Sequence, residues 1–435
     1  MSNDIIKKIP SGRWLHIIPP TILVYIVAFM DRTNIGFAIA GGMNKDLGIT
    51  STIAGVAAGI FFIGYMFLQV PGGRIAEKGS AKKFIAYTIV AWGGLAVLSG
   101  FVQNITQLLI IRFLLGVAEG GVYPAILTII SHWFPNKERG RANSFFIMNI
   151  PIASIITGPL SGWIISAYSW RYVFIIEGSI AFLLMFIWLP LISDRPCDAK
   201  WISKEEKDYI ENSLREEQAA LGGKGVVKQS IGKLLSNHNI WKLIAIYFCF
   251  NTGVYGFALW LPTILKTLTH SGMSGVGMLS TIPYIGTIIG LYVFATLSDR
   301  SMNRKLYTAI PLFGFAFCLL LSVLFKSNIW VSFAFITGCG VFFQATSGVF
   351  WTIPPILFDS DMAASSRGII NALGNLGGFA GPYLVGLLTT HFSAGVGTTS
   401  LVVFLFMAFL ITLTLPAKTG KLSGAQLQNN QAVDN

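Results

Sequence analysis

Apolar runs of about twenty residues recur along the whole chain, and they restrict its fold more than any other feature. A helix of that length crosses a hydrocarbon core of roughly 30 Å. Of the 435 residues, 53% are hydrophobic and only 11% are charged, so we predict an all-helical, integral membrane protein. Its predicted spans are 17–40, 53–76, 84–103, 107–131, 142–166, 171–192, 240–265, 276–298, 306–325, 329–358, 366–390 and 396–416.

The basic residues are distributed very unevenly between the two sides that these spans define. Of the 31 Lys and Arg residues, 25 lie on the side of the amino terminus, four on the other side, and Arg32 and Arg112 within spans. Such a bias marks the cytoplasmic side, so we expect both termini in the cytoplasm of a bacterium and the chain in its inner membrane. The net charge of +12 therefore reflects topology, and we expect no nucleic-acid partner.

One long polar interval divides the apolar chain into two sets of six spans. We expect an N-terminal six-helix bundle over 1–192, a cytoplasmic loop over 193–239, and a C-terminal bundle with a cytoplasmic tail over 240–435. Within the loop, a Ser cap followed by Glu two and three positions on predicts a short helix over 203–220, followed by a Gly-containing linker. Its mixed charges are typical of a solvated face, which we prefer to a regulatory role.

Two short loops at matching positions in the halves each place an acid beside a base. They follow the second and eighth spans, within 72–83 and 290–305. Their correspondence favours an internal repeat, as in transporters built from two related bundles. The alternative is the bias toward basic residues on the cytoplasmic side, acting on each loop separately. The acid–base neighbours are Glu77 with Lys78 and Asp299 with Arg300.

Four charged residues lie inside predicted spans, where a charge costs several kcal/mol, about 3 on insertion scales. Asp31 and Arg32 are adjacent in the first span. Arg112 and Glu119 are seven residues apart in the fourth span, so they share one helix face, which Gly116 between them leaves open. Charges at this depth usually line a substrate or ion pathway. The alternative is a buried ion pair that only holds helices together.

The chemistry of these groups suggests a division of labour. Arginine stays protonated and binds carboxylates through two parallel hydrogen bonds, so Arg32 and Arg112 suit an anionic substrate. Carboxyl groups withdrawn from water exchange protons near neutral pH, so Asp31 and Glu119 suit proton coupling. Adjacent helical residues point about 100° apart, so we expect Asp31 to face Arg112 and Arg32 to face a cavity. Either arginine could be the anchor. Glu177, about two turns into the sixth span, is interpreted as structural, pairing with a neighbouring loop.

Neutral polar residues in the second half are candidates for contact with substrate hydroxyls. Asn371 and Asn375 are four apart and share a helix face, and Trp351 lies on the tenth span. The alternative for the asparagines is bonding between helices in a Gly-rich packing face, and for Trp351 a packing or gate role. A single polar residue in a span often bonds helices together in the same way. Secondary candidates of this kind are Asn251 and Tyr255 on the seventh span and Asn149 on the fifth.

Six motifs along nearly the whole chain carry a resemblance to a known family. They are DRTNIGFA at 31–38, RFLLGVAEGGVYPA at 112–125, SHWFPNKERGRAN at 131–143, WRYVFIIEG at 170–178, WLPTI at 260–264 and NALGNLGGFAGPYLVG at 371–386. Together with the paired loops, they resemble the anion:cation symporter branch of the major facilitator superfamily. The first loop departs from the superfamily pattern, which favours Asp where this chain has Glu77.

The resemblance implies twelve transmembrane helices in two six-helix bundles, working by alternating access around a mid-membrane site. It implies substrate or switching contacts at Arg32 and Arg112 and protonation at Asp31 and Glu119. It also implies that both loops take part in conformational gating. The gating positions are Gly73, Glu77, Lys78, Asp299 and Arg300.

We predict a proton-coupled transporter that imports a small organic monoanion, and the asparagines favour a hexonate or related sugar acid. Aromatic acids, dicarboxylates and vitamins with one carboxylate would satisfy the same arginines, and sodium could replace the proton. The closest rival is an exporter or uniporter of another substrate class, although two embedded arginines would repel a cation.

Signatures of catalysis do not appear in the spans. The His and Cys residues are isolated, without metal-ligand spacing, and no activated nucleophile motif is present. We therefore expect no enzymatic activity, no metal and no cofactor. The expected partners are the organic anion, protons and the lipid bilayer, and we expect the chain to work as a monomer.

Overall fold

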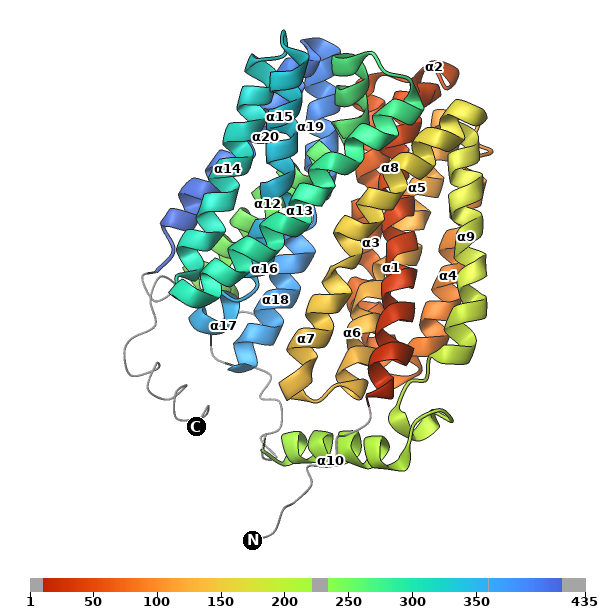
Figure 1. The fold of residues 1–435 in the computed structure, drawn as a ribbon, viewed down its shortest axis with the longest axis vertical. Coiled ribbons are helices and arrows are strands. Elements are labelled where there is room, and N and C mark those ends of the chain that lie inside the picture. Colours follow the sequence, from red (N-terminus) through yellow and green to blue (C-terminus); the bar gives the residue numbers. More distant parts are fainter. Residues whose placement is uncertain (1–10, 221–233, 359, 417–435) are drawn as a thin grey trace.

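The structure is a computed structural model, and it describes residues 11–220, 234–358 and 360–416. Helices and no strands make up the described ranges, which confirms the predicted all-helical fold. Backbone groups in hydrocarbon must bond within their own segment, so apolar runs of this length form helices. Figure 1 shows two groups of upright helices, with α10 (Lys204–Ala220) lying across one end and α2 (Asn44–Asp46) at the other. These ends are called the α10 end and the α2 end.

The first group of helices holds six membrane-length segments. Polar side chains begin three of them, because Thr50, Ser80 and Asn104 each accept a hydrogen bond from the backbone N–H three residues on. The first segment joins α1 (Gly12–Ala38), the π-helical turn η1 (Ile39–Met43) and α2. The others are α3 (Ser51–Lys78), α4 (Ala81–Ser99), α5 (Ile105–Gly120) with α6 (Val122–Trp133), α7 (Asn136–Ile147) with α8 (Asn149–Ala167), and α9 (Trp170–Leu191).

The second group follows the connection that contains the short 3-10 turn η2 (Pro196–Asp198) and α10. Its helices are α12 (His238–Thr269), α13 (Met273–Ser301), α14 (Arg304–Leu324), α15 (Ile329–Phe343) with α16 (Ala345–Phe350) and α17 (Pro354–Leu357), α18 (Ser360–Gly374) with α19 (Gly377–His391), and α20 (Ala394–Leu413).

One predicted span differs from the observed helices. Within the described ranges, 11 helical segments are long and apolar enough to cross a membrane. The remaining predicted span, 366–390, is divided, because α18 ends at Gly374 and α19 begins at Gly377. A Cβ on Gly377 would lie 2.2 Å from the carbonyl oxygen of Phe248, so glycine is needed where α12 passes this break. Glycine is also a poor helix former, so the glycines that let α12 approach here also favour the break between α18 and α19.

The two groups of helices are held together toward the α2 end. Helices α8 and α13 meet at glycines, because a Cβ on Gly158 would lie 2.7 Å from the carbonyl oxygen of Gly277. Lys266 Nζ on α12 donates to the carbonyl oxygen of Ala40 at 2.6 Å. Both contacts join elements of different groups close to the α2 end. The structure is therefore in a state that is closed at this end.

Candidate functional site

Arg32 on α1 and Glu119 on α5 form an ion pair inside the first group of helices. Arg32 Nη2 lies 3.2 Å from Glu119 Oε2, and both side chains are almost fully buried. Two charges withdrawn from water in this way need each other, because each alone would carry a large desolvation cost. The embedded acid and base of two predicted spans are thus in direct contact.

Aromatic rings surround the Arg32 guanidinium. Its Cζ lies 4.7 Å from the ring centroid of Tyr65 and 5.1 Å from that of Phe61, with Phe29 and Tyr25 slightly farther away. Ring faces attract a cation, most strongly where water is excluded. The rings stabilise Arg32 without neutralising it, so its charge remains available to an anion.

Arg112 bonds mainly to the backbone. Its Nη1 donates to the carbonyl oxygen of Asp31 at 3.1 Å, and its Nε donates to that of Ala57 at 3.3 Å. The side chain is completely buried and joins α5 to α1 and α3. Asp31 was expected to face Arg112 with its carboxylate. That carboxylate lies within electrostatic reach of Arg112 and beside the Trp92 indole, but neither of its oxygens has a hydrogen-bond partner among the described residues.

The helix face that carries Arg112 and Glu119 is packed rather than open. A Cβ on Gly116 would lie 2.0 Å from the carbonyl oxygen of Phe61, so glycine permits α5 to approach α3 closely. The prediction of an open face was wrong because a neighbouring helix fills the space that the missing side chain leaves. This close approach is what brings Arg112 within reach of backbone carbonyls.

Glu177 on α9 lies in the interior of the first group. Its carboxylate is fully buried and accepts hydrogen bonds from Asn34 Nδ2 at 3.1 Å and Ser161 Oγ at 2.6 Å. These bonds join α9 to α1 and α8. The predicted pairing with a loop was wrong, because two turns into the helix Glu177 has already reached the depth of Asn34.

A chain of amide side chains crosses from the first group to the second. Asn371 Nδ2 donates to Gln69 Oε1 at 3.3 Å, and Asn375 Nδ2 donates to Asn371 Oδ1 at 3.2 Å. Asn251 Nδ2 donates to the carbonyl oxygen of Gly374 at 3.1 Å and lies 3.5 Å from Asn375 Oδ1. Amides can donate to and accept from the hydroxyl groups of a ligand. The predicted asparagines on α12 (Asn251), on α18 (Asn371) and just after α18 (Asn375) therefore act as one set, which Gln69 of α3 completes.

Two aromatic residues of the second group border this region. The ring of Tyr255 lies 4.3 Å from that of Phe62 on α3, and its hydroxyl approaches the Arg32 guanidinium. Trp351 packs edge to face on Tyr247, with ring centroids 4.9 Å apart, and lines a cleft of about 80 Å³ that α7, α8, α13 and α16 also border. Tyr255 is thus placed near the embedded charges, whereas Trp351 lies where the two groups face each other.

The predicted gating loops have contacts that their sequences do not reveal. Asp194, which follows α9, accepts hydrogen bonds from Ser80 Oγ at 2.5 Å and Lys82 N at 2.8 Å in the first loop. Asp299 pairs with Arg304 at the start of α14 rather than with its neighbour. The predicted gating residues lie in the last turns of α3 (Gly73, Glu77, Lys78) and of α13 (Asp299, Arg300).

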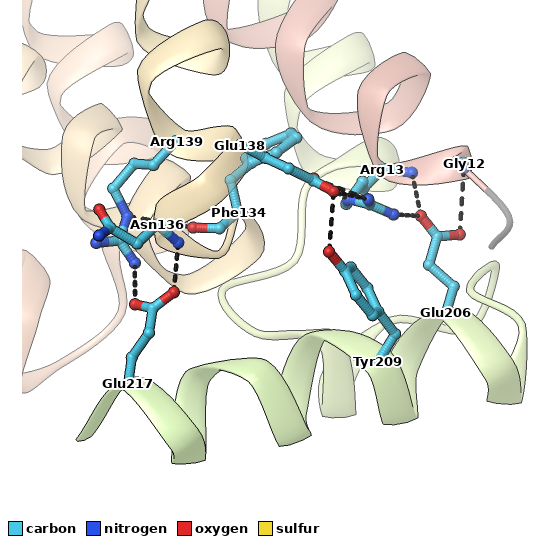
Figure 2. Close-up of polar contacts among 9 residues, drawn as sticks. All are labelled: Gly12, Arg13, Phe134, Asn136, Glu138, Arg139, Glu206, Tyr209 and Glu217. Atoms are coloured by element: carbon cyan, nitrogen blue, oxygen red, sulfur yellow. Dashed lines mark hydrogen bonds and ion pairs between the residues drawn. The ribbon is translucent and has the colours of Figure 1, made fainter. Parts of the chain in front are cut away.

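Helix α10 docks on the ends of α1 and α7 (Figure 2). Glu206 accepts from Arg13 N at 3.0 Å and Arg13 Nη1 at 2.7 Å, and Arg13 Nη2 donates to Glu138 at 2.8 Å. Burial and the Glu138 carboxylate raise the pKa of Tyr209, which keeps its hydroxyl a donor. The predicted solvated face is present, since Glu205, Asp208 and Glu216 are exposed, but the opposite face docks through Glu206 and Glu217. The linker predicted after it lies outside the described residues. Further contacts join Tyr209 to Glu138, and Glu217 to Asn136 and Arg139.

Several buried polar atoms around the ion pair have no hydrogen-bond partner among the described residues. Such an atom costs about 1–3 kcal/mol, so a concentration of them is typical of a functional site. Within the same ranges, no three His, Cys, Asp or Glu side chains are grouped so that they could hold a metal ion. The unpartnered atoms include both carboxylate oxygens of Asp31, Arg32 Nε, Glu119 Oε1, Asn34 Oδ1, Gln69 Nε2 and Asn149 Oδ1.

A family comparison agrees with this arrangement of helices and embedded charges. Residues 21–382 match the sequence pattern of the Major Facilitator Superfamily. The chain belongs to this superfamily. The predicted family is thereby confirmed, and the protein is a multi-pass membrane transporter of the Major Facilitator Superfamily, not an enzyme.

Relatives of similar length differ in what they are named for. A putative tartrate transporter of Agrobacterium vitis is 32% identical, over 98% of this chain and 100% of its own length. A quinolone resistance transporter of Acinetobacter baumannii is 32% identical, over 96% of both chains. A solved bacterial homologue of the human lysosomal transporter Spinster, inward-facing and unoccupied, has a TM-score of 0.73 at 17% identity. The match covers 95% of the present chain and 100% of the solved chain, which shows that the two proteins share a fold.

Some residues of this region were not predicted from the sequence. Gln69 carries a visible signal, since it is a single polar residue in the apolar run FIGYMFLQVP. Asn34 is similarly marked, because it lies one turn after Asp31 in a span. The rings around Arg32 carry no such signal, because aromatic residues are common throughout these spans.

Proposed function

We propose that this transporter imports a small organic anion together with protons, and that a hexonate or related sugar acid is its substrate. The observation that carries the proposal is the buried contact of Arg32 Nη2 with Glu119 Oε2 at 3.2 Å. When Glu119 takes up a proton it loses its charge, and Arg32 is then free to bind a substrate carboxylate. Proton binding and anion binding therefore promote each other.

The distribution of basic residues indicates which end of the molecule faces the cytoplasm. The loops at the α10 end carry most of the Lys and Arg residues, so this end faces the cytoplasm and the α2 end faces the periplasm. The state closed at the α2 end is then the one from which substrate is released to the cytoplasm. Substrate and protons bind in the opposite state, when the two groups have rocked about the mid-membrane site.

The number of protons determines whether transport responds to the membrane potential. A monoanion that crosses with a single proton, on Glu119, moves no net charge. A second proton, on Asp31, adds one positive charge inward, so uptake is then driven by the potential as well. The Asp31 carboxylate suits this role, because neither of its oxygens has a hydrogen-bond partner among the residues that the structure describes.

The substrate class is supported by the charged and amide groups that can still bond to a substrate. Arg112 is fully buried and bonded to backbone carbonyls, which leaves Arg32 as the anchor for one carboxylate. Gln69, Asn371 and Asn375 offer amides to hydroxyl groups. The relative named for tartrate, which is itself a hydroxylated acid, agrees with a hydroxylated substrate.

Uptake by purified protein in proteoliposomes tests this function. Radiolabelled gluconate, tartrate and benzoate are offered under an imposed proton gradient, an imposed sodium gradient, or none. We expect accumulation of gluconate driven by protons and lost in Arg32→Gln and Asp31→Asn, but kept in Arg215→Gln on the exposed side of α10. Equal uptake without a gradient, or in both site variants, would contradict the proposal.

A second candidate is export of an organic acid, which the relative named for quinolone resistance favours. The same Arg32 and Glu119 would then bind the acid from the cytoplasm and exchange it for incoming protons. The two candidates differ in direction. Proton-driven loss of preloaded gluconate or of a quinolone from the vesicles, with no proton-driven accumulation, would select the exporter.

A further inference from the structure

A cavity of about 640 Å³ opens at the α2 end of the second group of helices. Helices α12, α14, α15, α19 and α20 border it, together with η1 and the start of α3. None of the four embedded charged residues lines it. It is therefore separate from the site around Arg32.

The rim of this cavity is positively charged. Lys266 and His270 at the end of α12, and Lys326 between α14 and α15, line the cavity with exposed side chains. The residues that line it include no Asp or Glu. Lysines without a neighbouring acid leave an uncompensated positive potential, so the rim attracts anions. Lys266 donates one hydrogen bond to Ala40, and an ammonium has two further donors.

The floor of the cavity includes apolar side chains that a ligand can contact. Ile264, Leu268 and Val323 line it and are partly exposed. Ser and Thr side chains line the cavity as well, and the hydroxyls of Thr263 and Thr389 have no hydrogen-bond partner among the described residues. The cavity therefore offers a ligand carbon surface together with a few hydroxyl groups.

We propose that this cavity is a second anion site, which binds a carboxylate or phosphate at Lys266 and Lys326 and the apolar body of the same ligand on the floor. Its volume lies within the roughly 300–1,000 Å³ of small-molecule sites. A sugar acid has no apolar body to bury against Ile264, Leu268 and Val323, so this site favours an acid that has one. The inference does not require that the Arg32 site carries any particular substrate.

Titration calorimetry on purified Arg32→Gln protein tests the cavity without the embedded arginine. The probe is 2-naphthoate, and its controls are 2-naphthamide, which lacks the charge, and gluconate, which lacks the apolar body. We expect 2-naphthoate to bind at least about tenfold more tightly than either control, and its Kd to rise about tenfold when Lys266→Gln and Lys326→Gln are added.

Lys242→Gln is the matched control for Lys266→Gln. Lys242 lies on the same helix at the α10 end, and its Nζ likewise donates to a backbone carbonyl, that of Thr414 at 2.9 Å. We expect it to leave binding unchanged. Naphthamide binding as tightly as naphthoate, or a Kd indifferent to both rim lysines, would overturn the proposal.

The source of the anion is settled by a competing titration with short-chain phosphatidylglycerol. Displacement of 2-naphthoate, again dependent on Lys266 and Lys326, would assign the cavity to a lipid headgroup. Binding of 2-naphthoate that this lipid does not displace would assign it to a free organic acid. Both results support an anion site, whereas binding of neither ligand in a lysine-dependent way contradicts it.

Discussion

The two groups of helices contribute different chemistry to the region around Arg32. The first supplies the embedded charges, and these bond within the group: Arg32 to Glu119, and Arg112 to backbone carbonyls. The second supplies neutral groups, and the bond that crosses between the groups there joins the amides of Gln69 and Asn371. Neutral hydrogen bonds cost less to break than buried ion pairs. Charges can therefore stay paired within one rigid group while the two groups move apart and together.

The largest effect is expected at Arg32. Of Arg32 and Arg112, Arg32 is the one that backbone carbonyls do not mainly hold, so gluconate uptake in Arg32→Gln should fall by at least about a hundredfold, equivalent to roughly 3 kcal/mol. Arg32→Lys keeps the positive charge but lacks the two parallel N–H donors of a guanidinium, so its gluconate uptake rate should fall about tenfold. Initial uptake rates in proteoliposomes measure both. Equal rates in the two variants would mean that the guanidinium geometry does not matter.

Glu119→Gln should separate binding from coupling. Glutamine has nearly the same shape but cannot release a proton, so Arg32 no longer has a competitor that titrates. We expect proton-driven accumulation to fall to background while exchange of external for internal gluconate stays within about threefold. A variant that still accumulates substrate against a gradient would remove Glu119 from the coupling mechanism.

Asn371→Ala should change substrate preference rather than coupling. The substitution removes one amide from the row of hydrogen-bonded side chains that joins Gln69 to Asn375. The KM for gluconate should therefore rise about tenfold, equivalent to roughly 1.4 kcal/mol. The KM for benzoate, which has no hydroxyl groups, should hardly change. Asn212→Ala at an exposed position of α10 is the matched control. Parallel losses for both acids would indicate that Asn371 only packs helices together.

The smallest effect on transport is expected at Glu177, which bonds only to neutral groups. Glu177→Gln keeps an acceptor for Ser161 or Asn34, so uptake should stay within about twofold. Glu177→Leu leaves both donors unpartnered and should lower the free energy of unfolding by about 1–3 kcal/mol for each. Thermal unfolding in detergent measures this loss. Loss of proton coupling in Glu177→Gln, at unchanged stability, would make it a third protonation site.

The fold was largely predictable because length and hydrophobicity alone determine a span. The break in 366–390 was not, since it depends on where α12 passes Gly377, and no local pattern encodes the path of a distant helix. The positions of the embedded charges were predictable, but their partners were only partly so. Arg112 bonds to backbone carbonyls, which every residue carries and no sequence distinguishes.

Helix α10 likewise shows that a sequence does not reveal the bonding partners of charged residues. The sequence indicates a helix of mixed charge, and charge alone does not say whether water or another chain segment satisfies it. Glu206 is nearly fully buried because Arg13, almost two hundred positions earlier, supplies both its backbone N–H and its guanidinium. Only the folded chain brings these residues together.

The docking of α10 also bears on how the chain is made. Each partner that the structure gives this helix on α1 and α7, from Gly12 to Arg139, precedes it in the sequence. A ribosome releases those helices before α10, and α10 before any helix of the second group. Domains generally fold from the amino terminus during synthesis. Helix α10 can therefore dock on the ends of α1 and α7, and so stabilise the first six spans, while the rest of the chain is still being translated. The half that carries the embedded charges can thus bury them before the half that will move against it exists.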